Sequence, residues 1–134
     1  MEVILDSNVL FRVLISQGDI ISLLFDNRLK LFAPEILKEE FSNNKQEIIS
    51  KSKLSETEFE TLSLILFDKI AFVPLDEYKA FLPKAKKLLG KHEKDEDFVA
   101  LSLSKCTKVW TYESLLFEIG VGISTKQISD QLKE

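Results

Sequence analysis

MEVILDSNVLFRVL, the first fourteen residues of the chain (Met1–Leu14), contains a short apolar run, an abrupt stop and the start of an amphipathic segment. The run from Val3 to Leu5 is rich in β-branched residues, which is typical of a parallel strand covered on both faces. Asp6 ends the run, and apolar residues then return at helical spacing. The pattern places Asp6 at the carboxyl end of a central strand, where open α/β sheets bind their ligands.

Two roles are open for Asp6 from this stretch alone. It can be a turn-forming or capping residue, or it can bind a ligand at the strand end. We expect Ser7 or Asn8 to cap the following helix, because their side chains can accept hydrogen bonds from the first free N–H groups.

The composition is ordinary for one soluble globular domain that spans residues 1–134. Apolar residues make up 45% of the chain and charged residues 30%. No apolar stretch approaches the ~18 residues of a membrane span. The N-terminus lacks the basic segment and apolar core of a signal peptide. We therefore expect a cytoplasmic protein.

The chain has few residues that could support cysteine or histidine chemistry. Cys106 is the only cysteine, cannot form an intrachain disulfide, and is expected to be structural or incidental. His92, the only histidine, lies in the charged turn KHEKDED, where we expect it to be solvated. One histidine and one cysteine argue against a zinc site and against Ser-His-Asp or Cys-His catalysis.

The net charge of −4 does not indicate a general nucleic-acid binder. Phosphate contacts would need a local cationic patch. Candidate lysines crowd the stretch that leads into KHEKDED: Lys84, Lys86, Lys87, Lys91 and Lys94. A lysine run on a helix is more often a solvated face.

Strand and helix patterns alternate along the chain. Strands are expected at residues 3–5, 29–33, 70–73, 109–111 and 120–124. Helices are expected after Asp6, from Asp19, from Pro34 through Ile49, from the Ser55–Glu58 capping box, from Asp76 to Leu89 with a break at Pro83, over 95–103, and from a Thr125 cap to Leu132. Strands separated by helices of this length predict a three-layer α/β/α sandwich with a central parallel sheet of four to five strands.

Acidic residues recur where this sheet brings strand ends together. Asp6 follows the first strand and Glu113 the fourth, and these strands are neighbours at the switch point of a 3-2-1-4-5 order. Glu40 and Asp95 lie on helices that adjoin the same crevice. Carboxylates gathered without compensating arginines usually hold a hard divalent cation, which orients water for attack on a phosphodiester. The alternative is that a chain with 22 acidic residues places some of them there by chance.

Four segments are similar to motifs that occur together in one known protein family. ILDSNVL is similar to its opening pattern D-[ST]-[NS]-V-[LI], and FAPEILKEEF to its apolar-Pro-x-x-x-x-x-Glu-apolar segment. DEDFVALSL is similar to D-x-x-[FI]-x-A-[LT]-[AS]-L, and VWTYESLLFE to [IL]-W-[TS]-x-D-x-x-[FL]. The segments keep the family's order and spacing over nearly the whole chain. The chain thus resembles the PIN domain family, and is most similar to stand-alone prokaryotic PIN proteins, the group that contains VapC-like ribonuclease toxins.

The resemblance implies a catalytic metal site for Mg²⁺ or Mn²⁺. The implied ligands are Asp6, Glu40, Asp95 and Glu113, with Asp97 assisting. Glu39 matches the second acidic position less well than Glu40. Glu113 stands where the family usually has aspartate, which implies a shifted or water-mediated ligand, and Tyr112 stands where a small polar residue is common.

The resemblance also implies an activity and partners. Asn8 and Thr111 would orient a ligand or the substrate through hydrogen bonds. Arg12 lies one helical turn after Asn8, where it either approaches a phosphate from the helix face or is a surface charge. The implied activity is hydrolysis of RNA by metal-activated water. Family members commonly form homodimers, and toxin members are inhibited by a small antitoxin protein.

Three functions stay open at this point. The first is a metal-dependent endoribonuclease, either the toxin of a toxin–antitoxin pair or a housekeeping nuclease. The second is a PIN fold that binds RNA or protein without efficient cleavage, which the Glu113 departure keeps open. The third is a metal-dependent phosphatase, although Asn8 stands where a D-x-D phosphoaspartyl enzyme needs its second aspartate.

Overall fold

The computed structural model describes residues 1–134 and contains one five-stranded sheet. Its strands are β1 (Glu2–Leu5), β2 (Lys30–Pro34), β3 (Ile70–Val73), β4 (Val109–Trp110) and β5 (Gly122–Ile123). Every neighbouring pair is parallel, in the order β3-β2-β1-β4-β5. The predicted strand order is therefore confirmed.

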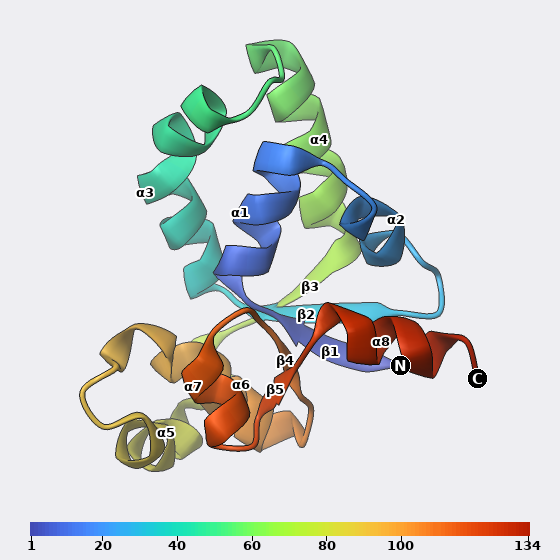
Figure 1. The fold of residues 1–134 in the computed structure, drawn as a ribbon. Helices are drawn as coiled ribbons and strands as arrows, with labels where there is room; N and C mark the ends of the chain where they lie inside the picture. The colour runs from blue at the N-terminus through green and yellow to red at the C-terminus, as the bar shows by residue number, and fades with distance from the viewer.

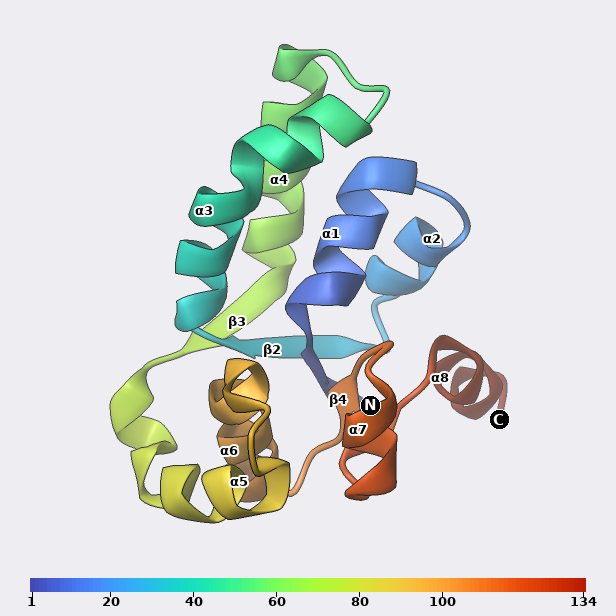
Figure 2. The same cartoon turned by 60° about the vertical axis from the view of Figure 1, so that its left-hand side comes forward.

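Helices cover both faces of this sheet (Figure 1, Figure 2). One face carries α1 (Ser7–Ser16), α2 (Ile20–Leu24), α3 (Ile36–Lys51) and α4 (Glu56–Lys69). The other carries α5 (Leu82–Leu89), α6 (Glu96–Lys105) and α7 (Ser114–Glu118), and α8 (Thr125–Leu132) follows β5. Three 3₁₀ turns, η1 (Leu75–Glu77), η2 (Lys79–Phe81) and η3 (Glu93–Asp95), flank α5. The predicted three-layer sandwich is confirmed, and every helix is too short or too polar to cross a membrane.

β1 lies at the centre of the core. Val3, Ile4 and Leu5 are completely buried, as the continuous apolar run requires when helices cover both faces of a strand. On α1 the buried residues Val9 and Val13 stand one helical turn apart and face the sheet. The opening stretch therefore forms the strand and helix that the rest of the core surrounds.

Two helix caps lie one residue earlier than predicted. Asp6, not Ser7 or Asn8, caps α1: its Oδ1 accepts a hydrogen bond from the Ser7 N–H at 2.8 Å. Ser124, not Thr125, caps α8, in a capping box with Gln127. A capping residue keeps an extended backbone, and Asp6 and Ser124 have ψ values of 150° and 161°. Ser7, Asn8 and Thr125, the residues predicted as caps, instead lie in the first turns of α1 and α8.

Two further boundaries and one helix differ from the prediction. Pro34 is the last residue of β2 and does not begin α3. The helix predicted from Asp76 is two 3₁₀ turns followed by α5, and Pro83 lies in the first turn of α5, where a missing N–H costs nothing. The sequence did not predict α7, because five residues are too few to show helical periodicity.

Candidate functional site at the carboxyl edge of the sheet

Asp6 lies at the carboxyl end of β1 and is 1% exposed. The sheet register pairs Leu5 with Trp110, so the ends of β1 and β4 are side by side. The Thr111 hydroxyl donates a hydrogen bond to Asp6 Oδ2 at 2.6 Å and accepts one from the Glu113 N–H at 2.9 Å. Thr111 thus connects the Asp6 carboxylate with the backbone of Glu113.

The two roles considered for Asp6 do not exclude each other. One carboxylate oxygen accepts the capping hydrogen bond from Ser7, and the other accepts the hydrogen bond from Thr111. The capping role is therefore confirmed. It leaves the carboxylate at the strand end, in the position predicted for a ligand.

A cleft of about 1050 Å³ opens at this edge, between α1 and α3 on one side and the segment around η3 on the other. Its lining includes every acidic residue predicted for the site: Asp6, Glu40, Asp95, Asp97 and Glu113. Glu39 is exposed and does not line the cleft, so the structure favours Glu40 as the second acidic residue. The topology brings together residues that are far apart in the sequence.

The cleft carboxylates raise one another's proton affinity. Burial, together with the charges of Asp95 and Glu40, raises the pKa of Asp6 from 3.8 to about 7, against the opposing effect of the Thr111 hydrogen bond. Burial and the Asp95 charge raise the pKa of Glu40. Burial and the Glu113 charge raise the pKa of Asp95. The acidic groups therefore face a shared space in which their negative charges repel.

Tyr78 forms a hydrogen bond with Asp97, another carboxylate of the cleft. Its hydroxyl donates a hydrogen bond to Asp97 Oδ2 at 2.5 Å, and the tyrosine is 1% exposed. Burial and this hydrogen bond raise the pKa of Tyr78, so the hydroxyl remains a donor. Sequence reasoning missed Tyr78, because it lies between two 3₁₀ turns and no local pattern connects it to Asp97.

Asn8 and Arg12 line the cleft in different surroundings. The Asn8 Oδ1 atom is buried and has no hydrogen-bond partner in the chain. The Arg12 guanidinium lies 5.0 Å from the centroid of the Tyr112 ring, a cation–π contact that orients it. The Asn8 oxygen is therefore an unsatisfied acceptor beside the acidic residues, and Arg12 is one of the positive charges at the cleft wall.

The cationic residues that precede α6 divide into two groups. Lys91 and Lys94 line the cleft, with His92 between them. His92 is exposed, as predicted, yet it borders the site. The remaining lysines of the predicted run lie on α5 outside the cleft: Lys84, Lys86 and Lys87. Only part of the lysine run is therefore placed to meet a phosphate.

Oxygen donors form the acidic part of the cleft, and this is the ligand chemistry of Mg²⁺ and Mn²⁺. No group of three or more acidic, histidine or cysteine side chains is arranged to hold a metal ion. Mg²⁺ commonly takes one or two protein carboxylates and keeps several waters. The repelling carboxylates and the unpartnered Asn8 oxygen fit such a hydrated cation, although they do not form a closed cage.

Comparison with known protein families gives a match to the PIN domain over residues 4–133. The chain belongs to the PIN domain family. A comparison with curated proteins finds no match. PIN domains are usually nucleases, which supports a nuclease-type function for the cleft. The resemblance seen in the four sequence segments is confirmed for the family as a whole.

Proposed function

We propose that this PIN domain is a divalent-metal-dependent endoribonuclease. One observation carries the proposal: the acidic residues predicted from separate segments all line one cleft at the carboxyl edge of a parallel sheet. Membership of a family of nucleases supports the same reading. A phosphodiester needs both charge neutralisation and an activated water at the point of attack, and a carboxylate-held cation provides both.

The residues of the cleft have distinct tasks in this proposal. Asp6, Glu40 and Asp95 would hold the cation, in part through its bound waters, with Glu113 and Asp97 at the sides of the site. When bound, Mg²⁺ or Mn²⁺ stabilises the charge that develops on the phosphoryl oxygens and makes water a better nucleophile.

The chain itself orients these groups. Ser7 and Thr111 fix the two oxygens of Asp6, and Tyr78 fixes one oxygen of Asp97. Burial raises the pKa of Glu40 in the metal-free cleft, and a bound cation would favour its ionised form again. Lys91 and Lys94 border the cleft on the side of η3, where they can neutralise phosphates of the RNA.

The finer assignment is a toxin of a toxin–antitoxin pair. The similarity of the four segments to the VapC-like group supports it, and with it a cytoplasmic homodimer inhibited by a small antitoxin. Expression in bacteria should then arrest growth, and co-expression of a small protein encoded beside the gene should restore it. Growth arrest that Asp6→Asn does not relieve would contradict this assignment.

A PIN fold that binds RNA without efficient cleavage is the second candidate. Two observations favour it: Glu113 replaces the usual aspartate, and no three of the side chains are arranged to hold a metal. Glutamate is one methylene longer than aspartate and must place its oxygens differently. Under this candidate, Glu113→Asp should create or strongly increase metal-dependent cleavage.

A cleavage assay separates the two candidates. The purified protein is incubated with a mixed RNA pool and Mn²⁺ or Mg²⁺, beside Asp6→Asn, Glu113→Ala and Glu113→Asp. Asp68→Asn, an exposed change on α4 outside the cleft, is the matched control. Cleavage that requires metal, survives in the control and disappears in Asp6→Asn supports the endoribonuclease. RNA binding without cleavage under any metal condition supports the second candidate.

A further inference from the structure

A groove between α1 and α3 extends the cleft away from the carboxylates. The two helices pack side by side (Figure 1, Figure 2). Phe11 and Ile15 on α1 are one turn apart and line the groove, as does Ile48 on α3. Because residues three or four positions apart share one helix face, each helix presents a continuous stripe to the groove.

The groove combines an apolar strip with amide groups. Phe11 and Ile15 are half-buried, and Ile48 is buried. Asn43 is exposed at the same groove, and Asn44 donates its Nδ2 hydrogen to the Glu40 carbonyl at 2.7 Å, which leaves its Oδ1 free to accept. A nucleobase has the complementary chemistry, since its faces are apolar and its edge carries donors and acceptors.

The lysines that could bind phosphates lie on the side of the cleft opposite the groove. Lys51, at the far end of the groove, is paired with Glu47 at 2.7 Å, and the Arg12 guanidinium lies over Tyr112. Lys91 and Lys94, across the cleft, form no ion pair. Two unpaired lysines therefore attract phosphates on the η3 side, whereas in the groove Lys51 is paired and the Arg12 guanidinium, which keeps its charge, lies over Tyr112.

We infer that the groove between α1 and α3 is a base-binding subsite, in which Asn43 and Asn44 recognise an unpaired nucleobase next to the cleaved phosphodiester. The inference rests on the proposed ribonuclease function and adds to it the residues that contact a base beside the cleaved phosphodiester. A base stacked and paired in a duplex presents neither its faces nor its full edge. The RNA must therefore be single-stranded where it enters the groove.

Binding measurements test the subsite directly. Fluorescence anisotropy in the Asp6→Asn background, which keeps the RNA intact, compares an unstructured RNA octamer, the same sequence in a duplex, and an abasic octamer with the same phosphates. We expect the unstructured RNA to bind about 10-fold more tightly than the other two, in line with the energy of base contacts to protein side chains. Asn43→Ala should weaken binding of the unstructured RNA about 5-fold and leave the abasic RNA unchanged.

Ser42→Ala is the matched control, because Ser42 is exposed on the same helix and does not line the cleft. In the otherwise wild-type protein, Asn43→Ala should change the base preference beside the cleavage site, and cleavage of the preferred sequence should fall in step with the weaker binding. Equal affinity for abasic and complete RNA, or equal effects of Asn43→Ala and Ser42→Ala, would overturn the subsite while metal-dependent cleavage upholds the proposed function. A wild-type protein that neither binds nor cleaves RNA would overturn both.

Discussion

Asp6 combines a structural and a chemical demand in one side chain. Its carboxylate caps α1 and accepts the Thr111 hydrogen bond, yet it is buried beside other acidic groups. Burial raises its pKa from 3.8 to about 7. The folded protein without metal therefore binds a proton at Asp6 more tightly than the unfolded chain does. The resulting contribution to stability is fully present below about pH 4 and is lost as the pH rises through about 7.

We expect the free energy of unfolding, measured with urea in EDTA, to fall between pH 4 and pH 8. Asp6 accounts for at most about 4 kcal/mol of this fall, the free energy that corresponds to the rise of its pKa from 3.8 to about 7. Asp6→Asn carries no titrating group there, so its pH dependence should be smaller by this amount. Saturating Mg²⁺ should reduce the fall in the wild type, because the cation stabilises the ionised carboxylate. Identical pH profiles of unfolding free energy for the wild type and Asp6→Asn would contradict the assignment of this pH dependence to Asp6.

Thr111 connects the ends of β1 and β4 through its hydroxyl. Thr111→Val keeps the shape of the side chain but leaves Asp6 Oδ2 without a donor and the Glu113 N–H without an acceptor. We expect a loss of about 1–3 kcal/mol in unfolding free energy at neutral pH and a loss of roughly 10–100-fold in metal affinity. Chemical denaturation and a Mn²⁺ titration of RNA cleavage measure the two effects. Thr111→Ser keeps the hydroxyl and should retain most of both properties.

At the scale of elements, the predictable parts were those with a repeating pattern or a strong stop signal. β1 and α4 follow from an apolar run and from the Ser55–Glu58 capping box. α7 has five residues and was not predicted, and β5 covers two residues where a strand over 120–124 was expected, so neither repeats its period often enough to be delimited. Asp6 and Glu40 were placed correctly at the cleft because strand order fixes the edge they share. The Tyr78–Asp97 hydrogen bond depends on how a loop folds back onto α6, which no local pattern encodes.

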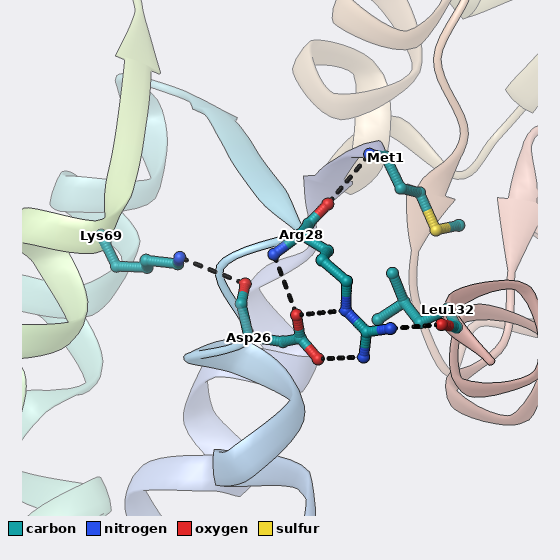
Figure 3. Close-up of polar contacts among 5 residues, drawn as sticks. All are labelled: Met1, Asp26, Arg28, Lys69 and Leu132. Atoms are coloured by element: carbon teal, nitrogen blue, oxygen red, sulfur yellow. Dashed lines mark hydrogen bonds and ion pairs between the residues drawn. The ribbon is translucent and has the colours of Figure 1, made fainter.

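The turn before β2 is connected to both ends of the chain (Figure 3). The Arg28 side chain pairs with Asp26 at 2.7 Å and donates through Nη1 to the Leu132 carbonyl at 2.5 Å. The Met1 ammonium donates to the Arg28 carbonyl at 2.9 Å, and Lys69 donates to the Asp26 carbonyl at 3.3 Å. The start of β1 and the ends of α4 and α8 therefore meet at this one turn.

Removal of the Arg28 side chain should loosen α8 without affecting the cleft. In Arg28→Ala we expect faster amide hydrogen exchange in the last turn of α8, because the Leu132 carbonyl loses its partner from the body of the domain. RNA cleavage should be unchanged. Lys126→Ala is the control, since it removes an ion pair at 2.8 Å to Asp130 that lies within α8 itself. Faster exchange of equal size in both variants would show that Arg28 does not hold the helix.

At the scale of the whole molecule, charge opposes the proposed substrate. The net charge is −4, and RNA is also negative, so long-range electrostatics slow the association. The attraction must come from the few cations that border the cleft. Lys91 and Lys94 meet this requirement, and they lie opposite the groove that we assign to the base.

The salt dependence of RNA binding tests whether Lys91 and Lys94 bind the RNA phosphates. For single-stranded RNA each phosphate contact contributes about 0.7 to the slope of log affinity against log salt concentration. Lys91→Ala/Lys94→Ala should therefore lower the slope by about 1.4 and weaken binding most at low salt. Lys84→Ala/Lys87→Ala removes the same charge from α5, outside the cleft, and should leave the slope unchanged. If both pairs lower the slope equally, the net charge governs binding and the cleft lysines have no special role. If only the first pair does, the RNA backbone follows the η3 side of the cleft and leaves the groove between α1 and α3 to the base.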